Sequence, residues 1–354
     1  MTTARLGGPT AKAPGATGPA RTGGAGPRRI TGLLAGVAVL AAVMLASVAI
    51  GARPVPPAAV WDALTAHDGS PDAVAVRDLR LPRTLLGVAV GVALGLAGAL
   101  MQALTRNPLA DPGILGVNAG AAAAIVTALS LLGLSHPGVY VWFGLLGAAG
   151  AFALVYLLGA RGGSASPARL AVAGTAVAAA LAAFTSAVVL FDAGAFDEFR
   201  FWAVGSIADR DLSVLWQVGP LIAAGALLAA TLGRGLNAIA LGDDTGRALG
   251  ARPGTVRGLA ALAAVILAAG ATAAAGPIGF VGLAVPHAAR AITGPDQRWV
   301  LAYSAVLAPI LLLAADVTGR LLARPGELEA GVVTAMVGAP VFIALVRRVR
   351  IARL

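Results

Sequence analysis

Ten apolar segments, all but one about as long as a membrane-crossing helix, follow one another along the 354-residue chain. A helix needs roughly 20 apolar residues to cross the hydrocarbon core of a bilayer. Hydrophobic residues make up 58% of the chain and charged residues only 12%, whereas a soluble domain carries about 25% charged residues. The sequence therefore predicts an all-α, polytopic membrane protein of about ten transmembrane helices. The predicted spans are 30–51, 83–104, 113–133, 138–160, 168–192, 213–232, 256–275, 279–293, 299–321 and 331–347.

The distribution of charge predicts the orientation of these spans. Residues 1–29 are polar and basic and are expected to form a disordered cytoplasmic tail, followed by a transmembrane domain over 30–354. With both termini inside, the inner segments carry 18 of the 26 Lys and Arg residues and 4 of the 16 Asp and Glu residues, as the positive-inside rule requires. The net charge of +10 therefore reflects topology and does not predict nucleic-acid binding. A multi-pass protein of the inner or plasma membrane is expected, with both termini cytoplasmic.

Two adjacent arginines before the first span allow two interpretations. Arg28 and Arg29 precede an apolar run, as in a twin-arginine export signal. The many spans that follow favour a charge anchor for an uncleaved first helix.

The short eighth span contains residues that a lipid-facing helix does not need. These residues are Gly279, Gly282, Pro286, His287 and Arg290. They suit a broken span that is buried among other helices, where irregular backbone and ionisable groups are tolerated. His287 has no second histidine or carboxylate at ligand spacing, so a buried, hydrogen-bonded histidine is favoured over a metal ligand. No metal and no cofactor are predicted, and the absence of cysteine excludes disulfides and Cys-ligated clusters.

The second span carries a stripe of glycines that ends in an amide side chain. The stripe consists of Gly87, Gly91, Gly95, Gly98 and Gln102. Small residues let helix backbones approach closely, and a buried amide can bond across the contact. Tight packing is the plainer interpretation. The following inner loop contains Asn107, Pro108 and Pro112. Several turn-forming residues in one loop restrict its backbone, which suggests a fixed shape near a pathway or a partner.

The inner loop between spans six and seven is predicted to contain a short interfacial helix bracketed by glycines. Its residues are Leu241, Gly242, Asp243, Asp244, Thr245, Arg247, Ala248, Leu249 and Gly250. Asp243 and Asp244 can occupy the first helical turn, with Arg247 at i+4 and i+3 from them. Such a helix would present Thr245, Ala248 and Leu249 to a cytoplasmic partner. An ordinary amphipathic connector is an equally good interpretation of the pattern alone.

The outer segments carry a second group of charges. Arg80 and Arg83 open the second span, and Asp316 and Arg320 lie at i,i+4 near the outer end of the ninth. A pair at that depth is often structural, and a docking surface for an acidic partner is the alternative. Lys12 is the only lysine, so the P-loop, which needs a lysine on the nucleotide phosphates, is excluded outside the tail. ATP-driven transport would require a separate ATPase subunit.

Together these motifs resemble the FecCD/BtuC-like permeases, the membrane subunits of ABC importers for iron–siderophores, haem and cobalamin. The resemblance covers the chain from about residue 30 onward. Its motifs are Arg80–Arg83, Gln102 with 106–112, 202–206, 241–250, 276–290, Asp316 with Arg320, and 338–342. One departure is Glu327-Leu328-Glu329, where the family usually has Glu-Leu-Pro.

The resemblance implies a BtuC-like fold, a ferric siderophore as cargo, and three kinds of partner: ABC ATPases, an extracytoplasmic substrate-binding protein and a second permease. It implies that Arg80, Arg83 and Arg320 dock the binding protein, and that 241–252 couples to the ATPase. It also places an inner gate at Gly163, Ser164, Ala165 and Ser166. Haem and cobalamin remain alternative cargoes. An ion-coupled secondary transporter using Asp316 or His287 is a weaker alternative, and a purely structural scaffold does not account for the broken eighth span.

Overall fold

The computed structural model describes residues 25–65, 69–134, 136–159 and 167–348, which form helices and contain no strand. The ten predicted spans correspond to ten helices in the same order. These are α1 (Ala25–Ala49), α4 (Leu81–Thr105), α5 (Val117–Leu132), α6 (Pro137–Gly159), α7 (Pro167–Phe191), α9 (Leu212–Ala240), α11 (Pro253–Ala275), α12 (Val281–Thr293), α13 (Gln297–Leu322) and α14 (Ala330–Arg348). Seven helices of the described part are long and apolar enough to cross a membrane, and α5, α12 and α14 are shorter.

Two boundaries differ clearly from the prediction. Helix α9 ends at Ala240, eight residues beyond the predicted end of the sixth span. It continues because Leu236 and Ile239 are buried against the bundle while Arg234 points outward, so the amphipathic pattern persists after the apolar run stops. Helix α1 begins at Ala25, inside the predicted tail, of which residues 1–24 lie outside the described part of the chain.

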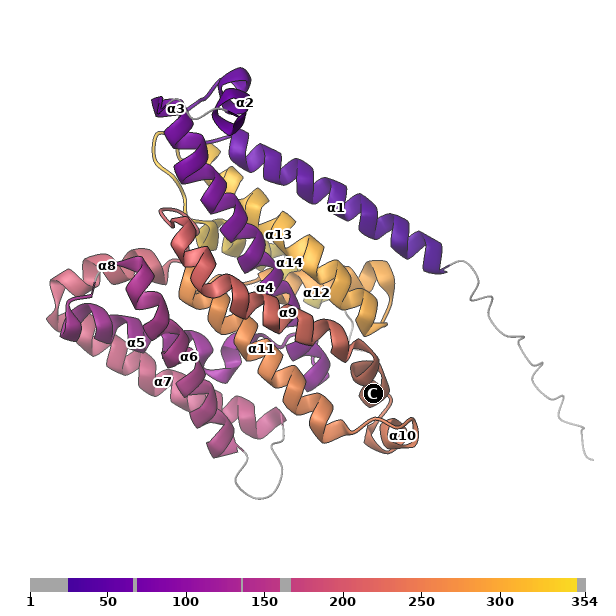
Figure 1. Cartoon of the computed structure of the whole chain (residues 1–354). Coiled ribbons are helices and arrows are strands. Elements are labelled where there is room, and N and C mark those ends of the chain that lie inside the picture. Colours follow the sequence, from indigo (N-terminus) through magenta and orange to yellow (C-terminus); the bar gives the residue numbers. More distant parts are fainter. Residues whose placement is uncertain (1–24, 66–68, 135, 160–166, 349–354) are drawn as a thin grey trace, which may run out of the picture.

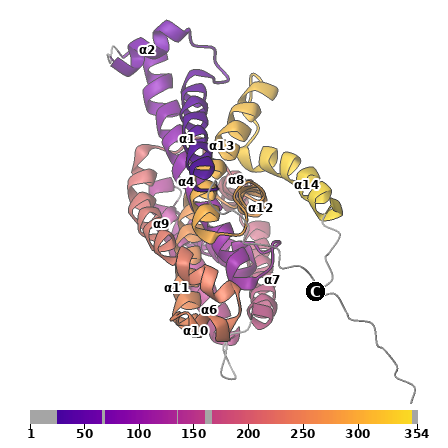
Figure 2. The same ribbon diagram turned by 90° about the vertical axis from the view of Figure 1, so that its right-hand side faces the viewer.

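Six short helices lie between the long ones. They are α2 (Pro57–Thr65), α3 (Pro71–Val74), η1 (Ala75–Arg80), η2 (Pro112–Leu115), α8 (Ala193–Ala203) and α10 (Asp243–Ala248). Figures 1 and 2 place α2 at one end of the bundle and α10 at the other. The end that carries α2 corresponds to the predicted outer side, and the end that carries α10 to the predicted inner side.

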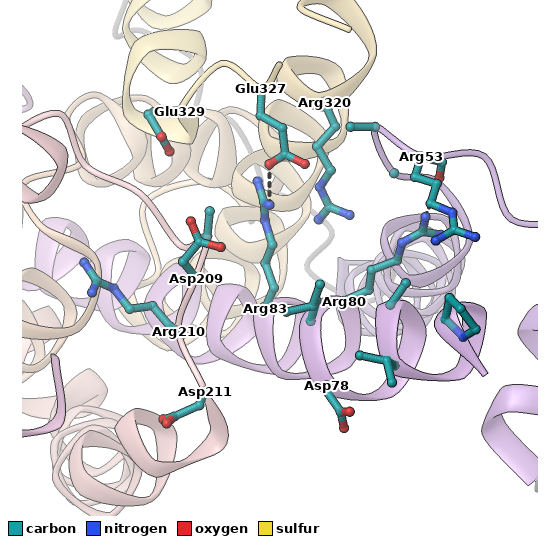
Figure 3. Close-up of a pocket in the computed structure, with 17 residues that line it drawn as sticks. Arg53, Asp78, Arg80, Arg83, Asp209, Arg210, Asp211, Arg320, Glu327 and Glu329 are labelled. Carbon is teal, nitrogen blue, oxygen red and sulfur yellow. Dashed lines mark hydrogen bonds and ion pairs between the residues drawn. The ribbon is translucent and has the colours of Figure 1, made fainter. Parts of the chain in front are cut away.

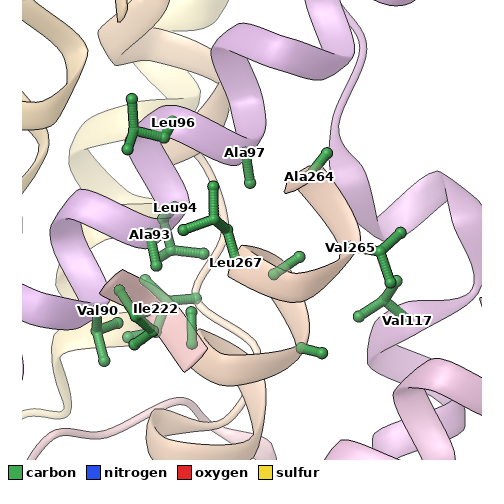
Figure 4. Close-up of a cluster of buried hydrophobic side chains, with 14 of the residues drawn as sticks. Val90, Ala93, Leu94, Leu96, Ala97, Val117, Ile222, Ala264, Val265 and Leu267 are labelled. Atoms are coloured by element: carbon green, nitrogen blue, oxygen red, sulfur yellow. The ribbon is translucent and has the colours of Figure 1, made fainter. Parts of the chain in front are cut away.

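The core is built around α4 and α11, the two most deeply buried long helices. Figure 4 shows Val90, Ala93 and Leu94 of α4 facing Leu267 of α11, with Ile222 of α9 beside them. Small side chains are frequent in α4 and make up most of α11. Because lipid offers no hydrophobic drive for helix association, close packing of small residues holds such a bundle together.

The glycine stripe of α4 lies where other helices approach most closely. A Cβ atom on Gly98 would overlap the backbone of Gly282 in α12, and one on Gly91 would overlap Pro309 in α13. The stripe is therefore a packing surface, which agrees with the plainer interpretation of the sequence. In contrast, α1 and α7 expose most of their residues, as expected of helices that face lipid or another subunit.

Candidate functional site

A buried ion-pair network joins α4 to α13 at the outer end of the bundle. The Arg83 guanidinium donates from Nη2 to Asp316 Oδ1 at 2.6 Å and from Nε to the same oxygen at 3.0 Å. Arg320 donates from Nε to Asp316 Oδ2 at 3.0 Å. Asp316 is 0% exposed and lies between the two arginines. The predicted i,i+4 pair is therefore present and buried, with Arg83 as an additional partner.

The remaining donors of this arginine cluster satisfy the end of α1. The last carbonyls of a helix have no partner within the helix. Arg320 Nη1 donates to the carbonyls of Ser47 and Ile50 at 2.7 and 2.9 Å. Arg80 Nη1 donates to the carbonyls of Val48 and Ala49 at 3.2 and 2.8 Å. Cations at a helix C-terminus are also favoured by the helix dipole, so these two arginines fasten α1 to the outer end of the bundle.

These three arginines line a cavity of about 800 Å³ at the outer end. Figure 3 shows Arg83 and Glu327 bonded to each other within it, with Asp209, Arg210 and Asp211 along another side. Arg83 Nη1 donates to Glu327 Oε2 at 2.5 Å. The lining is thus of mixed charge, with acidic groups from the 209–211 turn, from η1 and from the segment before α14.

Burial limits what the predicted docking arginines can reach. Arg80 is 6%, Arg83 8% and Arg320 1% exposed, and each bonds other groups of the same chain. The exposed charges of the cavity are mainly acidic, and they include Asp78 and Asp209. The sequence did not predict this acidic side, although the Asp-Arg-Asp run at 209–211 was a visible signal.

The predicted interfacial helix is α10, at the inner end. Gly242 and Gly250 flank it with φ of 106° and 81°, a region that favours glycine. Thr245, Ala248 and Leu249 are exposed, as predicted. Asp244 pairs with Arg247 at 2.7 Å, also as predicted.

Asp243 has other partners than the predicted Arg247. Its carboxylate accepts two hydrogen bonds from Arg257 of α11, at 2.6 and 2.9 Å, and one from Arg106 at 3.3 Å. The hydrogen bond from Arg257 is the main cause of a lowered pKa for Asp243. The carboxylate is therefore held ionised between two cations, because tertiary structure supplies a bidentate partner that the local spacing does not.

The predicted hallmark residues of α4 and α12 come together near the inner end. Gln102 donates to the carbonyls of Leu283 and Gly282 at 3.1 and 3.3 Å and accepts from Arg290. The predicted amide contact across the glycine stripe is thus present. Arg290 lies at this end of the bundle, on the side that the charge distribution predicts to be inner.

The other hallmark residues are placed separately. Asn107 accepts from the backbone N–H of Leu109 at 2.9 Å and forms an exposed turn with Pro108. Gly279 is exposed just before α12. On α12, Pro286 is buried and His287 is only half-buried, whereas the sequence predicts a buried histidine. Among the described residues, no group of three or more His, Asp or Glu side chains could hold a metal ion. The predicted gate residues Gly163, Ser164, Ala165 and Ser166 lie outside the described part of the chain.

Comparison with known proteins gives consistent matches over nearly the whole chain. The profile of the FecCD transport family matches residues 39–348. The ferric enterobactin transport system permease protein FepD of Escherichia coli is 46% identical over 85% of this chain and 90% of its own length. The hemin transport system permease protein HmuU of Yersinia pestis is 35% identical over 77% and 83%.

A solved structure supports the fold. It is described as an inward-facing conformation of a putative metal-chelate type ABC transporter, and it matches with a TM-score of 0.79 and 25% identity over 90% of this chain and 100% of its own. The chain belongs to the FecCD transport family.

Proposed function

We propose that the chain is the membrane permease subunit of an ABC importer for a ferric siderophore. The observation that carries this proposal is the 46% identity to a ferric enterobactin permease along nearly the full length of both chains. A relative described as a probable siderophore permease, YfiZ of Bacillus subtilis, is 40% identical over 82% of the chain. Haem remains the alternative cargo because a hemin permease also matches, and cobalamin remains open.

The ATPase is proposed to bind at α10. Leu241 and Leu249 are 65% and 64% exposed at the ends of this short helix, which is more apolar surface than a solvent-facing turn requires. The only lysine is Lys12, so the chain lacks the P-loop lysine in its membrane domain and depends on a partner for ATP hydrolysis. We propose that α10 faces the cytoplasm, and that the predicted 163–166 gate and both termini lie on the same side.

The outer cavity is proposed to receive the substrate-binding protein. Its mixed charge suits a partner whose acidic and basic groups interdigitate with it, and such pairs set register and encounter rate. Of the three predicted docking arginines, Arg83 is the best placed, because its Nη1 faces the partly exposed Glu327 at 2.5 Å. Arg80 and Arg320 would support the site through their bonds to the end of α1. The exposed helix α7 would face the second permease.

The burial of Asp316 weighs against an ion-coupled transporter. Both of its oxygens already accept hydrogen bonds from arginines, so neither is available to a transported ion.

The test is reconstitution into liposomes together with the cognate ATPase and binding protein. Uptake of radiolabelled iron as a siderophore complex should require ATP inside and binding protein outside. Uptake by the permease alone on a proton or sodium gradient would reject the proposal. Uptake of haem but not of any ferric siderophore would retain the importer and replace the cargo.

A further inference from the structure

Helix α10 is connected to α9 and α11 through two glycines with open surroundings, and it packs on α9 at the buried Gly246. Gly242 and Gly250 flank it, and a Cβ atom on either would meet no atom within 4 Å. Backbone with positive φ and open surroundings offers little resistance to rotation. A force on α10 would therefore be absorbed by its flanking turns unless something else fixes the helix to its neighbours.

One side chain of α10 supplies such a connection. Within the part of the chain that the structure describes, Asp243 is the α10 residue whose side chain bonds to other helices, whereas Asp244 and Arg247 pair with each other. Arg257 holds both carboxylate oxygens of Asp243, which fixes the orientation of the carboxylate as well as its position. Arg257 belongs to the first turns of α11, one of the two central helices.

The second cation on Asp243 comes from the other central helix. Arg106 ends α4 in the left-handed conformation, with φ of 50°, which is uncommon for a residue other than glycine. From this position its Nη2 donates both to Asp243 Oδ1 at 3.3 Å and to the carbonyl of Ile239 in the last turn of α9 at 2.5 Å. Asp243 is therefore the point where α4, α9, α10 and α11 meet.

Helix α4 extends this connection across the bundle. Four residues before Arg106, Gln102 bonds to α12. Near the opposite end of the helix, Arg83 bonds to Asp316 of α13. At about 1.5 Å per residue, α4 spans roughly 35 Å between Arg83 and Arg106, and its glycine stripe packs closely against α12 and α13. A displacement of α4 at its inner end thus reaches groups at its outer end through one rigid helix.

We propose that Asp243 is a positioning residue that transmits movement of α10 to α4 and α11 through Arg106 and Arg257, and does not itself contact the ATPase. This proposal rests on the proposed function, since it requires an ATPase at α10. It divides the predicted coupling segment into two parts. The exposed Leu241, Asp244 and Leu249 form the contact surface, and Asp243, whose side chain is 34% exposed against 100% for Asp244, forms the anchor.

The experiment compares Asp243→Asn, Arg106→Gln and the double variant with the wild-type complex in liposomes. Three quantities are measured: affinity for the ATPase, ATP hydrolysis with and without binding protein, and siderophore uptake. Allosteric couplings of this kind change the coupled quantity about 5–150-fold. We expect uptake per ATP hydrolysed to fall roughly tenfold in Asp243→Asn and by less in Arg106→Gln, which keeps the Arg257 pair, with ATPase affinity within about twofold of wild type in both. The double variant should be no worse than Asp243→Asn alone, because that substitution already weakens the link to Arg106 as well as the one to Arg257.

Two kinds of control separate anchoring from contact. Arg234→Gln and Asp197→Asn remove exposed charges elsewhere and should leave uptake unchanged. Leu249→Ala should weaken ATPase affinity and leave uptake per ATP unchanged once the ATPase is saturating. Asp243→Glu keeps the charge and should restore part of the coupling.

The outcomes are decisive for Asp243. If ATPase affinity falls in Asp243→Asn as much as uptake does, Asp243 is a contact residue and the proposal is overturned. Normal uptake per ATP hydrolysed in this variant would also overturn the proposal. Absence of ATP-driven uptake by the wild-type complex would instead overturn the proposed function. If a variant does not assemble, a spin label on Leu249→Cys, unique because the chain has no cysteine, still reports on α10. Its mobility should rise in Asp243→Asn, and an unchanged spectrum would reject the anchor.

Discussion

Asp316 Oδ1 accepts a 2.6 Å hydrogen bond from Nη2 of Arg83, a residue 233 positions earlier in the chain. The pair joins the first turn of α4 to the last turns of α13, and Arg320 completes it from the other side. Asp316 thereby neutralises part of a cluster of cations that would otherwise be buried together in an apolar bundle. The outer end of the permease is organised around this single carboxylate.

Replacing that carboxylate should destabilise the protein strongly. Asp316→Asn keeps the shape but leaves Arg320 buried without its counter-charge and Arg83 with Glu327 alone, and breaking a buried pair in this way costs about 3–5 kcal/mol. We expect a clearly lower melting temperature in detergent and a lower yield of folded protein. Asp78→Asn, at an exposed acid lining the same cavity, should change the melting temperature little. Equal effects of the two substitutions would contradict the structural role of Asp316.

The glycine stripe gives a second prediction about stability. In Gly98→Ala the new methyl group would overlap the carbonyl oxygen of Gly282, so α4 and α12 must move apart. Overpacking of this kind costs about 1–3 kcal/mol. The matched control is Gly150→Ala in α6, where a Cβ atom would meet nothing within 4 Å. Thermal unfolding of both variants in the same detergent should show a loss for Gly98→Ala alone, and tolerance of both would mean that the α4–α12 contact is looser than described.

The stability of the protein is expected to depend on pH through Asp296, at the inner end of α13. Asp296 precedes this helix and accepts from Arg298 Nη2 at 2.9 Å and from Asn237 Nδ2 at 2.7 Å. The hydrogen bond from Arg298 is the main cause that lowers the pKa of Asp296 to about 2. A carboxyl whose folded-state pKa lies below its unfolded value stabilises the fold above the unfolded pKa and loses this effect as the pH falls through the folded pKa.

The stabilising effect of Asp296 should therefore be constant from pH 7 to 5 and shrink between about pH 4 and 2. The difference in melting temperature between wild type and Asp296→Asn, measured across that range, checks this directly. A difference that already disappears between pH 7 and 5 would show that the pKa of Asp296 is not lowered.

How far the sequence predicts this molecule depends on the range of each interaction. The ten spans and the Asp316–Arg320 pair are visible in the sequence because hydropathy and i,i+4 spacing are local properties. The Arg83–Asp316 pair is not visible, because nothing near either residue specifies a partner in another helix. Asp243 shows the same limit: local spacing indicates Arg247, whereas the bidentate partner is Arg257 of α11.

The short helices at the outer end also could not be predicted from the sequence pattern. Helices α2 and α8 have too few residues to show a span in the hydropathy pattern. The charges that line the outer cavity come from η1, the start of α4, the 209–211 turn, α13 and the segments around residues 53 and 327–329. The three arginines singled out by the sequence do line it, but their burial and their bonds to α1 and α13 emerge only when helices distant in the chain are brought together.

The proposed docking role of Arg83 predicts that removing one neighbouring charge strengthens binding of the substrate-binding protein. Glu327 already occupies Nη1 of Arg83 at 2.5 Å, and its own side chain is 33% exposed. If Arg83 receives a carboxylate of the binding protein, Glu327 competes with that carboxylate. Glu327→Gln should then strengthen docking, and because a partly exposed ion pair contributes about 0.2–1 kcal/mol, the dissociation constant should fall by about 1.4- to fivefold.

The measurement is equilibrium binding of the binding protein to the permease in nanodiscs, at low and at physiological ionic strength. Glu329→Gln is the matched control, because it removes the same charge from the same cavity without freeing Arg83. A similar gain in both variants would indicate a general effect of charge, which salt would screen equally. A gain confined to Glu327→Gln supports Arg83 as the docking group. Unchanged or weaker binding in that variant would leave Arg83 with the structural role alone, since the freed guanidinium would then attract no partner.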